Sequence, residues 1–242
     1  MKTDVRQRIY SPAVSKFFCV IALLMFLAGI PNPLYAQAGS TCEPTTAVGD
    51  QKRTKMKHRK PASKGTKVVA ATVVEILDWE TPDDIADKEV KNSNAPIDEL
   101  EDDVFEIEGD LWRVALEAND CDYHLELSAP GGNQKAARII VEIPNDPEYI
   151  NTRKDLLEAL EPPDQGKLES SGEIKLNKPV RLKVRGSAFF DAAHYSPKFN
   201  PAKPGKCKFT KEQKLKRGNG HGTCAVGTLW ELHPIWVVEA GH

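Results

Sequence analysis

Two predicted strands each carry an acidic residue and a histidine two positions apart: Asp122 with His124, and Glu231 with His233. Side chains two positions apart in a strand point to the same face, so each pair presents a carboxylate and an imidazole together. Both groups are ligands for zinc and related divalent ions. The spacing therefore predicts a metal site if the two strands lie close together.

Three further residues belong to the same candidate site. Glu142 ends a neighbouring predicted strand, while Asp191 and His194 follow the end of another. The full candidate ligand set is Asp122, His124, Glu142, Asp191, His194, Glu231 and His233. A bound zinc or similar ion would lower the pKa of its water to about 7, and a carboxylate would serve as general base. This is the chemistry of a metal-dependent hydrolase or nuclease.

A structural role for the same residues is the alternative. Polar residues alternate onto the outer face of a strand by default, and a histidine before proline, such as His233, often bonds to a neighbouring strand or to a carboxylate. The sequence contains no HEXXH, G-x-S-x-G, Walker or Rossmann motif. No independent motif therefore selects one reaction.

Basic and aromatic residues define a second candidate site. Its members are Arg181, Lys183, Arg185, Phe189, Lys208 and Lys211. The first three alternate along one predicted strand, and the two last lysines lie in a lysine-rich loop at residues 198–217. Such a set suits an anionic polymer, either nucleic acid or an envelope polysaccharide. The alternative is that the lysines only keep a long loop soluble.

The elements that must position these residues follow from the alternation of apolar and polar side chains. Five strands are expected near residues 103–116, 121–128, 138–143, 179–191 and 229–239, with one helix from about 151 to 160 that ends at Pro162 and Pro163. The predicted fold class is all-β with one short helix. Three strands, a helix and two strands is the element order of the OB-fold, a small five-stranded barrel.

The first of these strands changes phase. Phe105 and Ile107 share one face, but after Gly109 the apolar set moves to Trp112 and Val114. A shift of one residue beside a glycine predicts a β-bulge or a sharp bend.

Residues 1–38 are predicted to be a signal peptide. Basic residues precede the apolar run at 17–30, and Ala36-Gln37-Ala38 supplies small residues at a cleavage spacing. The apolar run is shorter than the roughly 20 residues that cross a bilayer as a helix. The mature protein is therefore expected to be secreted or periplasmic, with no stable transmembrane span. An uncleaved anchor is the alternative.

Residues 39–102 are predicted to be a charged, largely disordered linker before a barrel domain at 103–242. Residues 52–67 are basic and nearly free of large apolar groups, so they cannot bury enough surface to offset their ordering entropy. Residues 75–110 are acidic. They are expected to attract each other as solvated arms, or the basic arm serves as a tail for an anionic polymer. Residues 68–79 suit a short helix or strand, and periodicity leaves the choice open.

The cysteines agree with an oxidising compartment. Of the 5 cysteines, Cys19 lies in the predicted signal peptide, which leaves an even number. Cys207 and Cys224 bracket a basic, glycine-rich loop, and a disulfide between them would stabilise the fold by about 3 kcal/mol. A thiolate zinc site is the alternative, although no C-x-x-C spacing is present.

Composition limits the class of protein. The chain has 242 residues, 33 Lys+Arg against 35 Asp+Glu and 40% hydrophobic residues, which excludes collagen-like, multi-span membrane and wholly disordered proteins. A net charge of -2 gives no global attraction to nucleic acid. The first hypothesis is an exported OB-like module that binds a ligand or polyanion; the alternatives are a metal-dependent hydrolase or nuclease, and a structural cell-envelope protein.

Four segments together resemble a family of uncharacterised secreted bacterial proteins. They are CDYHLELS (121–128), RIIVEIP (138–144), VRLKVRGSAFFDAAH (180–194) and LWELHPIWVV (229–238). The shared pattern is a D-x-H strand, an E-x-P strand, a G-x-x-F-F-D-x-x-H strand end and a final W-E-x-H-P strand. The resemblance covers about residues 104–239 and implies an OB-like barrel and export, but no reaction. The lysine-rich loop and the basic segment before Val68 fall outside the resemblance.

Overall fold

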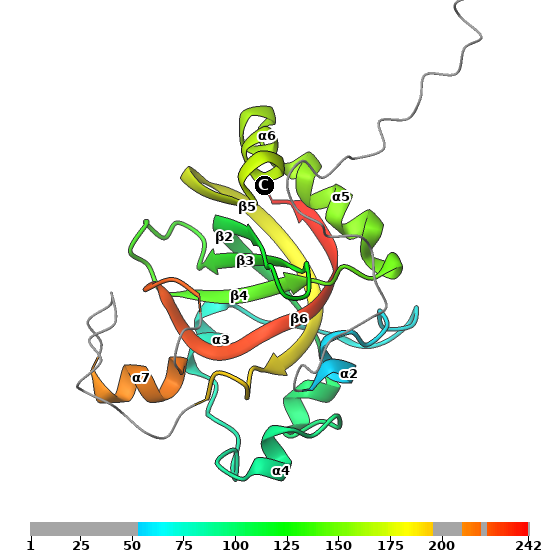
Figure 1. The fold of residues 1–242 in the computed structure, drawn as a ribbon, viewed down its shortest axis with the longest axis vertical. Coiled ribbons are helices and arrows are strands. Elements are labelled where there is room, and N and C mark those ends of the chain that lie inside the picture. Colours follow the sequence, from blue (N-terminus) through cyan, green and yellow to red (C-terminus); the bar gives the residue numbers. More distant parts are fainter. Residues whose placement is uncertain (1–52, 196–209, 219–221, 242) are drawn as a thin grey trace, which may run out of the picture. The chain divides into compact units, whose positions relative to one another are not determined.

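The computed structural model describes residues 53–195, 210–218 and 222–241, and these contain a closed β-barrel. Its five strands are β2 (Val104–Leu116), β3 (Tyr123–Ser128), β4 (Arg138–Ile143), β5 (Glu173–Phe190) and β6 (Val226–Ala240). They follow the order β2-β3-β4-β6-β5, and β2 also pairs with β5, which closes the barrel (Figure 1). Within the barrel β4 and β6 are parallel, and the other neighbours are antiparallel. The predicted all-β barrel is confirmed.

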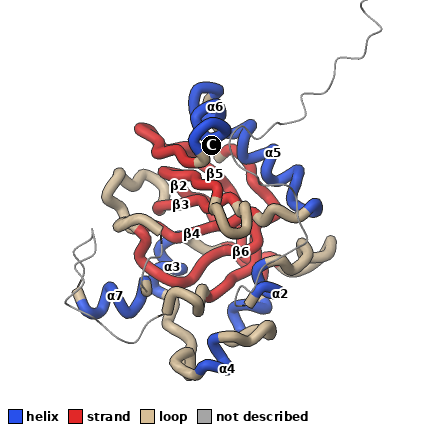
Figure 2. The backbone as a smooth tube through the Cα atoms, viewed as in Figure 1, coloured by secondary structure: helices blue, strands red, loops and turns tan. Residues whose placement is uncertain are grey.

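Two helices join β4 to β5, where the sequence predicts one. The expected helix is α5 (Ile150–Ala159), which follows the short 3₁₀ turn η2 (Pro147–Tyr149), and the second is α6 (Pro162–Ser171). Figure 2 shows both in blue beside the red strands of the barrel. Pro162 ends the first helix as predicted but also starts the second, because the fixed φ of proline suits a first helical turn, where its missing N–H is not needed.

The apolar segment at residues 68–79 forms both a strand and a helix. β1 (Val68–Ala70) pairs in parallel with β2 as a sixth strand, and α3 (Val73–Asp78) follows at once. Thr72 and Glu75 form a reciprocal capping box that starts α3. The helix buries Val73 and Ile76 against the barrel core.

The predicted irregularity in the first barrel strand is present in β2. The pairing register shifts between Leu111 and Arg113 on both sides of the strand, so Trp112 is the extra residue of a bulge. The bulge lies three residues beyond Gly109, where the backbone of β3 passes too closely for a side chain: an added Cβ would lie 3.0 Å from the carbonyl oxygen of Ser128. The phase shift in the sequence therefore marks a bulge, and the glycine marks a close strand contact.

Alternate side chains of the barrel strands fill its interior. Ile107, Leu125, Val141, Val184 and Leu232 are all almost fully buried there. Burying one such side chain contributes about 1.5–3 kcal/mol. The intervening residues point to the outside of the barrel wall, and on β3, β4 and β6 these are mainly acids and histidines.

The described part of the predicted linker is ordered, so the prediction of a largely disordered segment is wrong for residues 53–102. Besides β1 and α3, these residues form α2 (Thr54–Lys57), α4 (Lys88–Lys91) and η1 (Glu99–Asp102). Arg53 is 1% exposed and donates hydrogen bonds of 2.8 and 2.6 Å to the two carboxylate oxygens of buried Glu101. Among the described residues, the basic and acidic stretches thus meet through a buried ion pair, Arg53–Glu101, and not as solvated arms.

Several predictions fall outside the described residues. They include the signal peptide at 1–38, the first part of the linker and Cys207. None of the described helices, including α7 (Lys211–Arg217), is long and apolar enough to cross a membrane. The described cysteines Cys121 and Cys224 lie far from each other along the sheet. Cys121 precedes β3, at the end where Tyr123 pairs with Ile143, the last residue of β4. Cys224 precedes Val226, which pairs with Arg138, the first residue of β4. The Cys207–Cys224 disulfide therefore stays a prediction.

Candidate metal centre

Three strands bring acids and histidines together on the outer face of the barrel. On β3, His124 lies between core residues and pairs directly with Glu142 of β4. The parallel pairing of Val141 with Leu232 then places Glu142 beside His233 of β6. Strand alternation and sheet register together therefore produce the cluster that the i,i+2 spacing predicts.

Glu142 is the centre of this cluster. Its Oε1 lies 2.9 Å from Nδ1 of His124, and its Oε2 lies 2.8 Å from Nδ1 of His233. On the other side of the His233 ring, Nε2 lies 3.5 Å from Oδ2 of Asp122. Asp122, Glu142 and His233 each offer one ligand atom, and these three atoms lie within 4.8 Å of one another. We call these three residues the metal centre.

The metal centre is buried and has unused polar atoms. Asp122 and His233 are both 0% exposed. Among the described residues, no hydrogen-bond partner is present for Oδ2 of Asp122 or for either ring nitrogen of His233, because the close carboxylates lie outside hydrogen-bond geometry. An unsatisfied buried polar atom costs about 1–3 kcal/mol. Carboxylates lie 2.8 and 3.5 Å from the two ring nitrogens of His233. The two carboxylates and this imidazole are a donor set that suits a divalent cation, provided that His233 loses its proton.

Burial and charge shift the pKa values at the centre in opposite directions. Burial lowers the pKa of His233, but Glu142 and Asp122 outweigh burial and raise that pKa well above its ordinary value. Burial raises the pKa of Glu142, but His233 and Lys57 outweigh it and hold that pKa well below its usual range. At Asp122 burial dominates and raises the pKa. A metal ion that binds here would displace the proton of His233.

The N-terminal segment covers this face of the barrel. We call residues 53–60, which contain α2, the strap. Nζ of Lys57 lies 3.9 Å from Oε2 of Glu142. Burial lowers the pKa of Lys57, but Glu142, Asp191 and Glu231 outweigh burial and raise it. Arg59 fixes the strap further by donating to the backbone oxygens of Glu101 (2.6 Å) and Ala188 (2.5 Å).

The other candidate ligands surround the metal centre without joining it. Oε2 of Glu231 lies 3.5 Å from Nδ1 of His233. His124 contacts Glu126 and Glu142; burial lowers its pKa, but these two carboxylates raise it to about 10. Asp191 and His194 form their own pair at the end of β5. Of the seven candidates, three form the centre and four supply hydrogen bonds and charge around it.

Sequence reasoning missed the strap residues that approach the centre. Lys57 and His58 belong to the basic stretch whose partner was expected to be the acidic segment at 75–110. That expectation holds for Arg53, which pairs with Glu101, but not for Lys57. The one sequence feature that could have indicated a cation such as Lys57 here is the number of acids on outward positions of β3, β4 and β6. Buried carboxylates need a positive charge close to them.

The basic row of β5 is paired with acids, contrary to its expected role as a free cationic surface. Arg181 lies 2.6 Å from Asp110, and Lys183 lies 3.1 Å from Glu239. These pairs form because β5 lies between β2 and β6, whose outward residues at these positions include acids. The charge that an anionic polymer would meet is therefore largely compensated.

Of the remaining binding candidates, Arg185 is paired with an acid and Phe189 is buried. Arg185 lies 2.5 Å from Glu106. Phe189 is 1% exposed, because Arg53 and Lys57 lie over its ring, at 5.0 and 5.7 Å from its centroid. The expected stacking surface is therefore wrong. Lys211 begins α7 and Lys208 lies outside the described residues, so the role of both lysines stays a prediction.

Comparisons of the chain with protein-family models, with curated proteins and with solved structures found no match. The resemblance to secreted bacterial proteins therefore stays a prediction.

Proposed function

We propose that the protein is an exported OB-like barrel that binds a divalent metal ion at Asp122, Glu142 and His233. The observation that carries this proposal is the convergence of three ligand atoms within 4.8 Å in a buried place where polar atoms of Asp122 and His233 lack hydrogen-bond partners among the described residues. Protein interiors rarely leave such atoms unsatisfied unless an ion, a water or a function explains them.

Metal binding accounts for the described residues better than the two other hypotheses. Binding of an anionic polymer draws no support from Arg181, Lys183 and Arg185, since each has an acidic partner. Hydrolysis would require substrate to reach the metal, whereas the strap lies over the centre with Lys57 beside Glu142. A bound ion in this position would act as a binding and stabilising group.

Export remains part of the proposal. It rests on the signal-peptide pattern at residues 1–38 and on the even number of cysteines outside it. The proposed Cys207–Cys224 disulfide belongs to the same oxidising compartment. Mass spectrometry of the exported protein without reduction would test the cleavage near Ala38 and the disulfide together.

Metal titration of the mature protein, purified without a histidine tag, tests the proposed function. We expect one zinc ion per chain by elemental analysis and by isothermal titration calorimetry. Asp122→Asn and Glu142→Gln keep the side-chain shape and remove a charged ligand, so each should weaken binding by at least about 100-fold, more than the loss of an outer-shell partner.

The matched control is Glu117→Gln, which removes a half-exposed carboxylate close to His124 but outside the metal centre. Its zinc affinity should equal that of the wild type. A wild-type protein that takes up no stoichiometric zinc, manganese, calcium or magnesium would overturn the proposal, as would unchanged affinity in Asp122→Asn and Glu142→Gln.

A further inference from the structure

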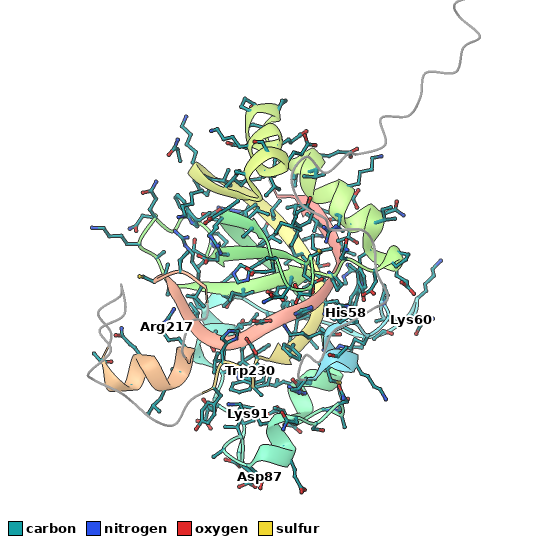
Figure 3. All side chains as sticks on the ribbon, viewed as in Figure 1. His58, Lys60, Asp87, Lys91, Arg217 and Trp230 are labelled. Carbon is teal, nitrogen blue, oxygen red and sulfur yellow. The ribbon has the colours of Figure 1, made fainter. Side chains whose placement is uncertain are left out.

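His58, at the end of α2 in the strap, has the surroundings of a metal ligand. Its Nδ1 lies 2.6 Å from Oδ2 of Asp146, and the side chain is 11% exposed. Its other nitrogen, Nε2, is buried and has no hydrogen-bond partner among the described residues. The histidine that is labelled in Figure 3 therefore has one nitrogen held by a carboxylate and one left over.

The contact with Asp146 fixes the tautomer of His58. A metal-binding histidine usually donates its second ring N–H to a carboxylate or a carbonyl, which leaves the lone pair on the ligating nitrogen. With Nδ1–H donated to Asp146, the lone pair of His58 lies on Nε2. The hydroxyl of Tyr149 also donates to the backbone oxygen of Arg59, the next residue, and this holds the strap in place.

The ring of His58 lies against the metal centre. Its centroid is 6.4 Å from that of His233, and the two rings meet edge to face. Two imidazoles on one tetrahedral zinc ion, with Zn–N bonds of about 2.0–2.1 Å, have centroids about 5 Å apart. The two ring centroids therefore lie about 1 Å further apart than on a common ion, so the ring of His58 would have to move toward the metal centre when an ion binds.

We propose that His58 is the fourth ligand of the metal centre, so that Asp122, Glu142, His233 and His58 together bind a zinc-class ion. This inference rests on the proposed metal binding. It adds the class of the metal ion and the identity of a fourth ligand. Two imidazoles and two carboxylates form a tetrahedral set of the kind that zinc takes, whereas calcium and magnesium require six or more oxygen ligands.

The charges around the centre permit a dication beside Lys57. Asp122 and Glu142 would neutralise the ion. Glu231 and Asp191 both act on Lys57 and remain to balance its charge. The ion would thus join the strap to the barrel without expelling the lysine. Residues 53–60 would then be held more tightly in the metal-bound protein.

Zinc affinity and an imidazole count on the full mature chain test this inference. His58→Ala should weaken zinc binding by at least about 100-fold, as expected for the loss of a ligand and more than for the loss of an outer-shell partner. With Cu²⁺ as the probe, electron spin-echo modulation should detect two imidazoles in the wild type and one in His58→Ala. Asp146→Asn, which leaves His58 in place but changes its hydrogen bond, should weaken binding to a smaller extent.

The matched control is His194→Ala, because His194 is paired with Asp191 outside the metal centre. This variant should keep the wild-type affinity and two imidazoles. Circular dichroism confirms that each variant is folded, and His58→Gln replaces His58→Ala if the alanine variant is not. Equal affinity and two imidazoles in the His58 variant would overturn the inference and leave the proposed function standing. No zinc binding by the wild type would overturn both.

Discussion

Glu126 is a buried carboxylate whose charge is compensated from three directions. It is 0% exposed and accepts hydrogen bonds from Arg138 (3.1 Å) and Arg113 (3.3 Å). It also accepts 2.8 Å and 2.5 Å bonds from the backbone N–H and the hydroxyl of Thr223. Burial raises its pKa, but His124, Thr223 and Arg113 outweigh burial and lower it to about 2.

This pKa predicts acid sensitivity with a defined sign. Because the pKa of Glu126 is lower in the folded than in the unfolded chain, its charge stabilises the fold above the ordinary value of 4.5, and this contribution is lost as the pH falls from 4.5 toward 2. The contribution at pH 7 is about 3 kcal/mol. Urea unfolding of Glu126→Gln should show a lower free energy at pH 7 and a weaker pH dependence between 5 and about 2.5.

Glu108 provides the control for this prediction, because it is an exposed acid on β2. Glu108→Gln should change the free energy of unfolding by less than about 0.5 kcal/mol at any pH in this range. A Glu126→Gln protein with the wild-type pH dependence would contradict the assignment of acid sensitivity to this residue.

At the scale of elements, the strap depends on one buried ion pair. Arg53 and Glu101 are 1% and 0% exposed at their side chains. Arg53 also donates to the backbone oxygen of Phe190 at the end of β5, so it links the strap, η1 and the barrel. Removing one partner of such a pair leaves an uncompensated buried charge.

We therefore expect Arg53→Met to lower the free energy of unfolding by about 3–5 kcal/mol. Lys55→Met is the matched control, since Lys55 is an exposed cation in α2 and its replacement should change stability by less than about 0.5 kcal/mol. Thermal unfolding of both variants at one ionic strength measures the difference. Equal stability of the two would show that the strap does not depend on Arg53.

The antiparallel pairing of β5 with β6 depends on a glycine. An added Cβ at Gly186 would lie 2.5 Å from the carbonyl oxygen of Pro234 and 2.9 Å from the Cα of Ile235. The β5–β6 register shifts on both sides of this residue. The close backbone approach explains why the strand accepts a residue without a side chain at this position.

Gly186→Ala should destabilise the barrel by about 1–3 kcal/mol, because the backbone of β6 must move. Gly166 gives the opposite expectation: it lies inside α6 and an added Cβ would meet nothing within 4 Å. Gly166→Ala should therefore stabilise by about 0.5–1 kcal/mol. Chemical denaturation of the two variants compares them, and a shift of the same sign in both would contradict the structural explanation.

Element positions follow from the sequence where alternation is strong. β4 has the predicted bounds, and the bulge in β2 is predicted from its change of phase. β5 begins at Glu173, before the predicted start at 179, because its first residues pair with β2 beyond the bulge, and this partner is set by tertiary structure. α6 has only Leu168 as a buried residue, so it carries almost no helical periodicity that a sequence could reveal.

At the scale of the whole molecule, the proposed metal binding should be coupled to folding. An ion that binds only the folded chain stabilises it by about 2.7 kcal/mol at a free concentration of 100 times Kd. We expect zinc to raise the Tm of the wild type and EDTA to reverse the increase. Asp122→Asn should show neither effect, whereas Glu117→Gln should show both. A wild-type Tm that does not respond to zinc would contradict the coupling.

The metal centre was partly predictable at this scale. Asp122 and His233 come from the two predicted i,i+2 pairs, and Glu142 comes from the end of a neighbouring predicted strand. The order of an OB-like barrel places these strands together. The approach of Lys57 and His58 depends on the docking of one short helix, α2, across the barrel, and four helical residues carry no periodic pattern. Long-range packing of this kind is decided by buried charge pairs that a linear pattern does not contain.

The position of the strap also predicts an order of folding events. Nη2 of Arg59 lies 3.4 Å from the backbone oxygen of His233, a residue 174 positions further along the chain. The ribosome makes the strap early, but its docking surface is complete only when β6, the last strand, has been made. Closing a loop of that length in the unfolded chain costs about 4–5 kcal/mol of chain entropy. We expect the barrel to form first, because its own contacts then offset this cost before the strap docks. The segment that is translated before every barrel strand is therefore expected to dock after all of them.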